Sequence, residues 1–418
     1  MFEVNMLLII VSQIKILTCD LSALRRHGFR LVFVGVPEVC NALPKNNLSI
    51  IEKVYPLASI NTDTLSPIVK NYVNEVGAAA LHILSAGEAS LRVVAKVRDH
   101  FNIVGNSEEE IVPFLDKVIM KDKVSECGVR IPKHISFDKA AYQKDKTAYL
   151  KEIENQLPYP MFIKPIELYG AASARKLNNR DELIEAAESM LNMKLEYEID
   201  EYISGVLCHC NCLIVDGEIQ FQEFEEYTVP CSWFDEGYIL GGIPLREEDP
   251  RWQRLDRMNR EVIACLKAPN GATHCEIFIT DKDELIFLEI ASRPPGAMVP
   301  DVIEKMTGMQ IDLEHIKARL GIPIQVPKKQ IDEYYMWAYI PKKAGQVKAL
   351  LEPDLKSEYE ITWNIKVGDQ CAVEEDEEAA IVFQSSSRAG RILIHNKDYG
   401  QLYEDFLKLR TMTLVITD

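Results

Sequence analysis

Residues 271–293, GATHCEIFITDKDELIFLEIASR, constrain the fold of this chain more than any other stretch of its sequence. Apolar and polar residues alternate on both sides of a short polar segment, a pattern that predicts an antiparallel β-hairpin. If the central Lys-Asp pair forms a two-residue turn, the register places Glu276 directly opposite Glu289. The hairpin therefore predicts two carboxylates that face each other from neighbouring strands.

Opposed carboxylates flanked by apolar residues repel each other and destabilise a hairpin unless a cation lies between them. A hard divalent cation meets that need, because Mg²⁺ accepts one or two protein carboxylates and completes its shell with water and phosphate oxygens. The spacing alone leaves a second interpretation open, in which Glu276 and Glu289 are a solvent-facing pair on an edge hairpin. His274 lies on the same face as Glu276, where it is either a substrate contact or a structural histidine.

The overall charge limits the partners of the chain. Lys and Arg number 47 and Asp and Glu number 64 among 418 residues, which gives a net charge of −17. Proteins that neutralise a nucleic-acid backbone or an anionic membrane surface present basic faces, so we expect neither partner. The apolar stretch 6–17 is too short and too polar for a membrane span, and we interpret it as a buried strand.

The ten cysteines are spread along the chain without paired spacing. This is typical of reduced thiols in a cytosolic protein rather than of a disulfide framework. Cys208, Cys210 and Cys212 alternate along a predicted strand, and we interpret them as small apolar side chains on one face rather than as a metal site. The expected location is therefore the cytoplasm.

The hydrophobic pattern changes along the chain. From about residue 16 to 100, short apolar runs alternate with helical stretches such as 68–85, which indicates a parallel α/β unit. Three short β-rich segments come later, at 197–203, 207–215 and 218–224. The stretch 225–245 is rich in aromatic residues without periodicity, and we interpret it as a functional loop.

Lys164 ends an apolar strand-like segment and precedes a loop of small residues, YGAAS at 169–173. Backbone N–H groups of such a loop approach an anion closely, so the lysine and the loop together predict a phosphate cradle. A lysine at the end of a strand is also a common structural feature. Nothing in the local sequence distinguishes Lys117 from Lys121 and Lys123.

The order of these motifs resembles that of the ATP-grasp superfamily of ATP-dependent carboxylate–amine ligases, over about residues 80–325. Asp116-Lys117 lies before CGVRIP, as in the family's first nucleotide-binding helix. FIKP followed by GAAS is similar to the second lysine strand and its phosphate loop, and DEYISG at 200–205 is similar to the hinge between the lobes. The sequence motif HxE…LEIASRPPG looks most like that of the bacterial L-amino acid (dipeptide) ligases and their biotin-carboxylase-like neighbours.

This resemblance implies that the two lysines and the small-residue loop contact the phosphates of ATP, and that the hinge receives adenine. The residues expected to bind the nucleotide are Lys117, Lys164, Gly170, Ala172, Ser173, Asp200, Glu201, Tyr202 and Ile203.

The resemblance also implies a catalytic centre. Glu276 and Glu289 would ligate Mg²⁺, for which Mn²⁺ can substitute. Arg293 would steady an acyl phosphate or an oxyanion, and Lys164 and His274 are the other expected catalytic residues.

The implied fold combines α/β and α+β parts. It is an ATP-grasp fold with an N-terminal Rossmann-like (pre-ATP-grasp) domain and a C-terminal α+β region. The expected divisions are 1–112 for the N-terminal domain, 113–205 for the small lobe with the phosphate loop, 206–325 for the large lobe with the metal site, and 326–418 for the C-terminal region. Ala291 departs from the family pattern, since many members have an asparagine two residues after the second glutamate.

The implied reaction joins a small-molecule carboxylate to an amine, with amino acids as the leading substrates. It passes through an acyl phosphate and releases ADP and phosphate. The protein would act in the cytoplasm, as a monomer or a homodimer. Two alternatives stay open, a biotin-carboxylase-like carboxylation and a non-catalytic ATP-binding subunit, and the sequence does not distinguish a free metabolite from a protein as acceptor.

Overall fold

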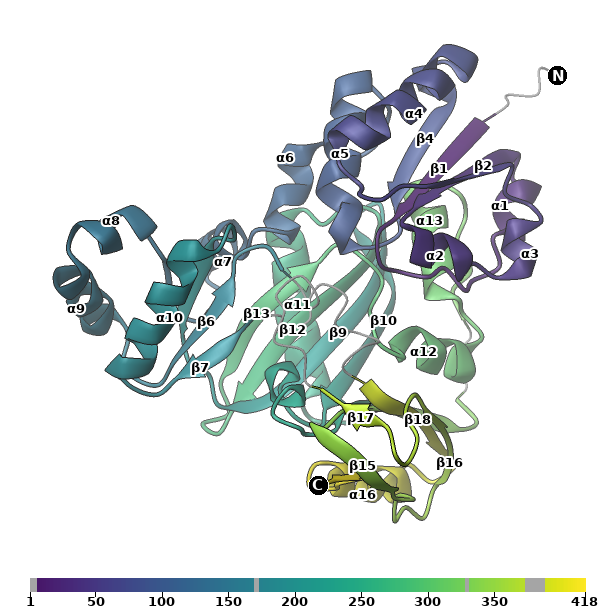
Figure 1. Ribbon diagram of the computed structural model, residues 1–418. Coiled ribbons are helices and arrows are strands. Elements are labelled where there is room, and N and C mark those ends of the chain that lie inside the picture. Colours follow the sequence, from purple (N-terminus) through teal and green to yellow (C-terminus); the bar gives the residue numbers. More distant parts are fainter. Residues whose placement is uncertain (1–5, 169–172, 328–330, 373–387) are drawn as a thin grey trace.

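The N-terminal part of the protein is a parallel α/β unit. The computed structural model describes residues 6–168, 173–327, 331–372 and 388–418 (Figure 1). The parallel sheet has the order β3-β2-β1-β4, with strands β1 (Met6–Ser12), β2 (Phe29–Gly35), β3 (Lys53–Pro56) and β4 (Leu81–Ser85). Helices α4 (Thr62–Val76) and α5 (Leu91–Phe101) cover one face of this sheet. The other face packs against α1 (Ser22–Arg26), α2 (Pro37–Asn41) and α3 (Lys45–Leu48) and against a helix from much later in the chain.

Two of the sequence expectations fall in this unit. The apolar stretch 6–17 does contain a buried strand, β1, whose five central residues are at most 1% exposed. The expectation of a helix over 68–85 is wrong in its second half. Helix α4 ends at Val76, because Gly77 has a φ of +80° that suits glycine and breaks the helical path, and β4 follows.

A second, antiparallel sheet forms the small lobe, on the left in Figure 1. Its order is β5-β8-β6-β7, with strands β5 (His134–Ser136), β6 (Met161–Pro165), β7 (Arg175–Leu177) and β8 (Tyr197–Glu201). Helices α8 (Lys139–Lys144), α9 (Lys146–Gln156) and α10 (Arg180–Asn192) share its apolar core. Helices α6 (Glu108–Ile111) and α7 (Lys117–Glu126) connect it to the N-terminal unit.

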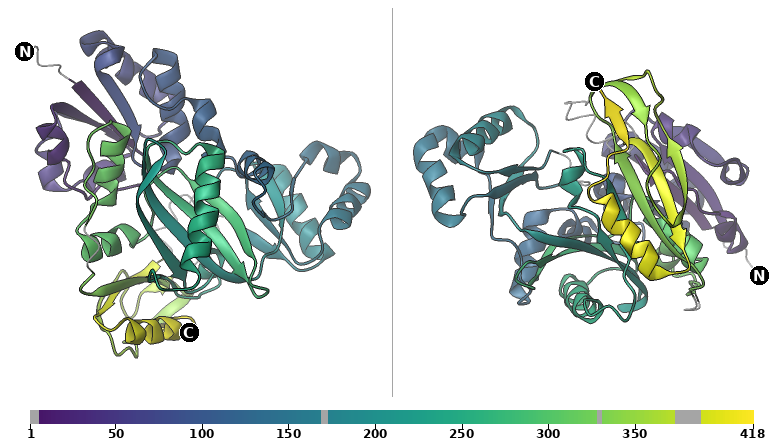
Figure 2. Two further views of the ribbon diagram at one scale, coloured as in Figure 1. Left: turned by 180° about the vertical axis from the view of Figure 1, so that it is seen from behind. Right: turned by 90° about the horizontal axis from the view of Figure 1, so that it is seen from below.

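The largest sheet has eight strands in the order β13-β12-β9-β10-β11-β14-β18-β16. These are β9 (Gly205–Val215), β10 (Glu218–Tyr227), β11 (Leu240–Pro244), β12 (Gly271–Thr280), β13 (Leu285–Ala291), β14 (Tyr334–Pro341), β16 (Glu358–Trp363) and β18 (Arg388–Asn396). Helix α11 (Trp252–Leu266) lies across one face, seen from behind in Figure 2. Helices α12 (Val299–Thr307) and α13 (Ile311–Arg319) pack on the other face. The C-terminal strands thus continue the sheet that carries the carboxylate hairpin.

The core under α11 explains the three alternating cysteines. Cys208, Cys210 and Cys212 are fully buried on the α11 side of β9, in contact with the apolar residues of that helix. They pack as small apolar side chains, as predicted. The stretch 225–245 is less irregular than expected, because it contains the end of β10, a short 3-10 helix at Cys231–Phe234 and strand β11.

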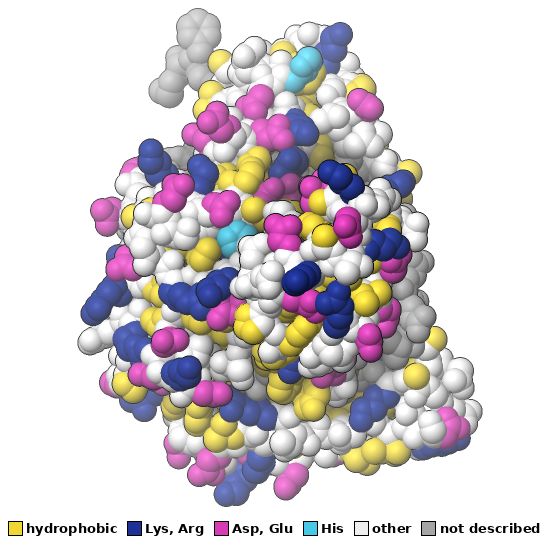
Figure 3. Space-filling model, turned by 90° about the vertical axis from the view of Figure 1, so that its left-hand side faces the viewer, with side chains coloured by type: hydrophobic (Ala, Val, Ile, Leu, Met, Phe, Trp, Pro, Cys, Tyr) yellow, Lys and Arg dark blue, Asp and Glu magenta, His cyan; other side chains and the backbone are white. Residues whose placement is uncertain are grey.

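The C-terminal region closes with helix α16 (Tyr399–Leu409) and a small sheet, which comprises β17 (Gln370–Cys371), β15 (Gly345–Leu350) and β19 (Val415–Thr417). No helix within the described residues is long and apolar enough to cross a membrane. Figure 3 shows acidic and basic side chains interspersed over the face that carries the small lobe.

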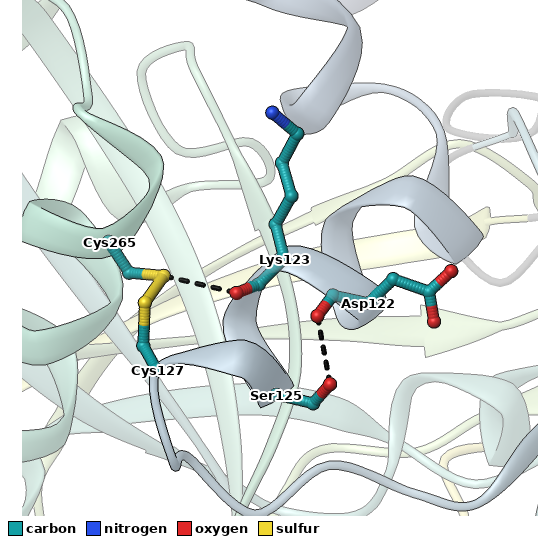
Figure 4. The surroundings of a disulfide bond; sticks show 5 residues. All are labelled: Asp122, Lys123, Ser125, Cys127 and Cys265. Carbon is teal, nitrogen blue, oxygen red and sulfur yellow. Dashed lines mark hydrogen bonds between the residues drawn. A yellow bond between two sulfur atoms is a disulfide. The ribbon is translucent and has the colours of Figure 1, made fainter.

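A disulfide bond corrects the expectation that all cysteines are reduced. Cys127, directly after α7, is bonded to Cys265 in the last turn of α11 (Figure 4), with the two Cα atoms 6.2 Å apart. The other eight cysteines are free. The two cysteines are 138 positions apart in the sequence, and no local pattern predicted the pairing, because only the packing of α7 against α11 brings them together.

We expect the double substitution Cys127→Ser and Cys265→Ser to lower the free energy of unfolding by about 2–4 kcal/mol without reductant, because the cross-link restricts the unfolded chain. Urea unfolding followed by circular dichroism measures the difference. Wild-type protein treated with reductant is the control and should match the double variant. Equal stability of the untreated wild type and the variant would contradict the bond, as would a non-reducing digest without the linked peptide.

Candidate active site

The hairpin of β12 and β13 brings Glu276 directly opposite Glu289, as predicted. It does so through a different turn, in which the Thr280 N–H donates to the carbonyl of Glu284 and three residues, 281–283, form the loop. A β-bulge just before Glu289 then adds one residue to β13. The two irregularities cancel, so the predicted register holds at the carboxylates although it fails at the turn.

The two carboxylates have opposite pKa shifts. Burial, and next the charge of Glu289, raise the pKa of Glu276 to about 8. Burial would also raise the pKa of Glu289, but the charges of Lys117 and Lys164 outweigh it and hold that pKa below its usual value. Glu276 is only 8% exposed. An additional cation beside Glu276 would therefore relieve a repulsion that the protein's own lysines leave in place.

Two lysines from different elements face this pair. Lys117 is the first residue of α7, whose N-terminus is capped by Asp116. Its Nζ lies 3.7 Å from Glu289 Oε2 and also donates to the carbonyl of Leu168. Lys164 is buried on β6, on the strand predicted for it. The structure thus singles out Lys117 from the three lysines of α7 as the one that faces a carboxylate of the hairpin.

Behind Lys164 lies a buried cluster of two lysines and two acids. Lys121 Nζ is 2.8 Å from Glu198 Oε2 and 2.6 Å from Asp200 Oδ1. Lys164 Nζ is 3.2 Å from Asp200 Oδ2 and 3.5 Å from Glu198 Oε1. Burial opposes ionisation of Asp200, yet the two lysines hold its pKa below the usual value. The four charges cancel, and the cluster fixes the position of the Lys164 ammonium group.

Arg293 is also held by an acid from another part of the chain. Its Nε donates to Glu88 Oε2 at 2.9 Å. Glu88 begins a short 3-10 helix of the N-terminal unit, just before α5. Burial opposes the charge of Arg293, but Glu88 raises the pKa of the guanidinium above its usual value. The N-terminal unit thus positions a charged side chain beside the carboxylate pair.

His274 belongs to a buried polar network under the carboxylates. Its Nδ1 lies 2.8 Å from Asn211 Oδ1 and its Nε2 lies 3.5 Å from Glu276 Oε1. Asn211 in turn donates to His209 Nδ1 at 3.1 Å. Burial, and next Arg293, hold the pKa of His274 well below its usual value, so the imidazole is neutral. The network fixes the orientation of His274 next to Glu276.

An open cavity of about 880 Å³ lies between the two lobes and reaches these groups. Both lysines and both glutamates line it, and so do the predicted hinge residues, which are Asp200, Glu201, Tyr202 and Ile203. Glu201 is paired with Arg130 at 2.8 Å, and Lys176 Nζ lies 4.3 Å from the ring centre of Tyr202.

The predicted phosphate loop is only partly described. Ser173 has a φ of +56°, a left-handed conformation that a tight loop requires. Gly170 and Ala172 lie outside the described residues.

Three charged residues of this site were not predicted, namely Glu198, Lys121 and Glu88. Glu198 alternates with the predicted Asp200 along β8, so both point to one face of the strand, and this pattern was a usable signal. Lys121 follows Lys117 by one helical turn, but a lysine at that spacing is ordinary on an exposed helix. Glu88 carries no local signal, because only the tertiary fold brings it to Arg293.

Comparisons with known proteins found similarity to ligases. Residues 124–312 match the family model described as the D-ala D-ala ligase C-terminus. An L-arginine-specific L-amino acid ligase from Bacillus subtilis is 26% identical over 230 residues, which are 54% of this chain and 54% of that protein. The chain thus spans about half the length of this curated relative.

Solved structures resemble the whole chain. The crystal structure of an L-amino acid ligase from Bacillus licheniformis covers 99% of both chains with a TM-score of 0.73 and 16% identity. That of N5-carboxyaminoimidazole synthetase from Staphylococcus aureus, complexed with ADP, covers 97% of both with a TM-score of 0.67 and 15% identity. These likenesses are of fold, and they confirm the expected ATP-grasp fold and the resemblance to its ligases.

The buried cluster behind Lys164 predicts a large effect of a single lysine. We expect Lys121→Met to lower the free energy of unfolding by about 3–5 kcal/mol at pH 7, because one buried carboxylate loses its partner. Lys123→Met, exposed on the same helix, should change it by less than about 0.5 kcal/mol. Urea denaturation measures both.

The loss of unfolding free energy caused by Lys121→Met should become smaller in acid. Asp200 has a folded pKa below its ordinary value of 3.8, so its paired charge stabilises the fold above that pH. The difference between wild type and Lys121→Met should therefore shrink as the pH falls through the folded pKa of Asp200. If the wild type and Lys121→Met differ little in unfolding free energy at pH 7, or differ more in acid, the ion pairs of the cluster do not stabilise the fold as described.

Proposed function

We propose that this chain, which has the ATP-grasp fold, is an ATP-dependent carboxylate–amine ligase that acts on amino acids. The observation that carries the proposal is the opposed pair Glu276 and Glu289, which faces Lys117 and Lys164 in the cavity between the lobes. Two buried like charges opposite each other destabilise the fold, and a protein without a catalytic role gains nothing that offsets this cost. The names of the relatives, which are amino acid ligases, support the substrate class.

The carboxylate pair fits a hard divalent cation. Mg²⁺ takes oxygen ligands from one or two carboxylates, and burial followed by the charge of Glu289 raises the pKa of Glu276 to about 8, a shift that a bound cation would oppose. Glu276 and Glu289 would hold the ion, which supplies neutralisation of charge on the phosphate oxygens when it is bound. Mn²⁺, which also takes oxygen ligands, would substitute.

The lysines and the hinge would position ATP. Lys117 of α7 and Lys164 of β6 both line the cavity, where their ammonium groups would orient the β- and γ-phosphates. Tyr202 and Ile203 line the same cavity, and their backbone groups would receive adenine, together with Glu201. Ser173 and the loop before it, with Gly170 and Ala172, would cover the phosphates.

The reaction then follows in two steps. An oxygen of the substrate carboxylate attacks the γ-phosphorus, the bond to the β-phosphate oxygen breaks, and ADP leaves. The amine attacks the carbonyl carbon of the acyl phosphate, loses a proton, and phosphate leaves. Arg293 would stabilise the tetrahedral oxyanion of this second step. His274, neutral and oriented by Asn211, would contact the substrate beside Glu276.

We also propose a role for each part of the chain. Residues 113–205 and 206–325 would close on ATP as the small and large lobes. Residues 1–112 would supply Glu88 to the catalytic centre, and 326–418 would complete the large lobe.

A screen of nucleotide and product tests the proposal directly. The full-length protein is incubated with ATP, Mg²⁺ and pairs of amino acids, and ADP release is measured with mass spectrometry of the product. We expect ADP with an amide-linked product. Activity only with bicarbonate would support the carboxylase alternative, and no turnover with any pair would contradict the ligase.

We expect Glu289→Gln to keep the fold but to abolish Mg²⁺-dependent ADP release, because a neutral amide is a poor ligand for a hard cation. Glu284→Gln, in the exposed turn of the same hairpin, is the matched control and should keep wild-type turnover. Circular dichroism checks that both variants are folded. Wild-type turnover by Glu289→Gln would contradict the metal assignment.

We expect Lys164→Ala to weaken ATP binding by about tenfold or more, because the charge that faces the phosphates is lost. Isothermal titration calorimetry with a non-hydrolysable ATP analogue measures the change. Lys151→Ala, an exposed lysine of α9 in the same lobe, should bind the analogue as the wild type does. Unchanged affinity of Lys164→Ala would rule out its phosphate role.

A further inference from the structure

A second cavity also borders the carboxylate pair. It is open to solvent, has a volume of about 750 Å³, and shares Glu276, Glu289 and Cys231 with the cavity between the lobes. The aromatic part of its lining is formed by Tyr227, Phe234, Trp337 and Tyr339. The first two come from the 225–245 stretch and the last two from β14. A substrate in this cavity would therefore reach the groups of the proposed reaction.

Arg388 brings a positive charge to this cavity from the C-terminal region. It is the first residue of β18, which pairs with β14 at Pro341 in the large sheet. Its guanidinium carbon lies 4.1 Å from the ring centre of Tyr339. The C-terminal strands thus add a charged group to a cavity whose other walls come from the large lobe.

The charge of Arg388 is not balanced by the part of the protein that the structure describes. Among those residues no carboxylate lies within 4.0 Å of its guanidinium nitrogens, and its Nε is buried without a hydrogen-bond partner. Arg293, the other arginine of the cavity, is paired with Glu88. Arg388 is hydrogen-bonded to Tyr339, but within the described lining it is the cation that has no carboxylate partner, and its Nε is a donor without a partner.

The geometry suits a carboxylate. A guanidinium that lies over an aromatic ring is attracted by the face of the ring, and its N–H groups point outward in the plane. These groups match the two oxygens of a carboxylate in a bidentate arrangement. A partly buried guanidinium without an anion leaves a donor unsatisfied, which costs free energy that a bound carboxylate would recover.

We propose that Arg388 binds a second carboxylate, distinct from the one that is phosphorylated, on a substrate in the aromatic cavity. The inference rests on the proposed ligase function. It deepens that function, because it requires that the substrates together carry two carboxylates. The second carboxylate belongs either to the amino acid that supplies the amine or to the side chain of an acidic amino acid that supplies the acyl group.

Substitutions at two arginines of one strand separate this role from general effects. Arg388→Gln removes the charge and keeps a planar polar group, and Arg388→Lys restores the charge without the bidentate fork. Arg391→Gln is the matched control, since Arg391 is exposed on β18 and does not line the cavity. Circular dichroism and binding of a non-hydrolysable ATP analogue check the fold and the nucleotide site of each variant.

The test measures binding of defined probes to the full chain in the presence of the ATP analogue and Mg²⁺. Calorimetric titrations compare L-alanine with L-alaninamide, and L-glutamate with L-glutamine. We expect the wild type to bind a carboxylate probe more tightly than the matching amide. Arg388→Gln should lower the affinity for that carboxylate probe by about tenfold or more and leave the affinity for the amide unchanged. Arg388→Lys should recover part of the affinity, and Arg391→Gln should behave as the wild type.

The two pairs of probes distinguish the sources of the second carboxylate. If Arg388→Gln loses only the preference for alanine over alaninamide, the second carboxylate belongs to the substrate that supplies the amine. If it loses only the preference for glutamate over glutamine, the second carboxylate belongs to an acidic amino acid that supplies the acyl group. Equal affinities of the wild type and Arg388→Gln for every probe would overturn the inference, and so would a wild type that binds no probe. The ADP-release screen tests the ligase function separately. If Arg388 is needed for binding of a carboxylate probe but the protein releases no ADP, the ligase proposal is contradicted and the carboxylate site is not.

Discussion

Two like charges held opposite each other in a mostly apolar hairpin are the constraint on which this site depends. Glu276 and Glu289 face one another across β12 and β13, and burial followed by the charge of Glu289 raises the pKa of Glu276 to about 8. Such a pair is stable only where cations surround it. Lys117 and Lys164 bring positive charge to it from a helix and a strand of the small lobe.

The other charges show how the fold keeps these groups in place. Lys164 is held by Asp200, and Lys121 balances the remaining acid of the buried cluster. Arg293 is held by Glu88 from the N-terminal unit. Each of these cations is paired before any substrate binds, so their positions are fixed in advance. Preorganised charge of this kind is the main source of electrostatic stabilisation in phosphoryl and acyl transfer.

Much of the site could be predicted from the sequence because its signals are local. The alternation on either side of the turn predicted the opposition of Glu276 and Glu289. The predicted turn was wrong, and a β-bulge of one residue restored the register. Period-2 patterns fix which residues share a face even where the loop length is misjudged. The order of the lysine, hinge and hairpin motifs was sufficient to predict the ATP-grasp fold.

Contacts between distant segments could not be predicted. Glu88 and Arg293 are 205 residues apart, and the disulfide joins cysteines 138 residues apart. No periodicity or motif marks such pairs, because only the packing of the N-terminal unit and of α7 against the large lobe creates them. Arg388 is the same case, since β18 reaches the aromatic cavity only through the order of strands in the large sheet.

The central claim is that the opposed glutamates serve phosphoryl transfer from ATP to a carboxylate. Hydroxylamine trapping measures this directly, since hydroxylamine replaces the amine and converts an acyl phosphate into a stable hydroxamate. We expect one ADP for each hydroxamate formed, and neither product when Mg²⁺ is removed with a chelator. AMP and pyrophosphate in place of ADP, or hydroxamate formed without a divalent cation, would contradict it.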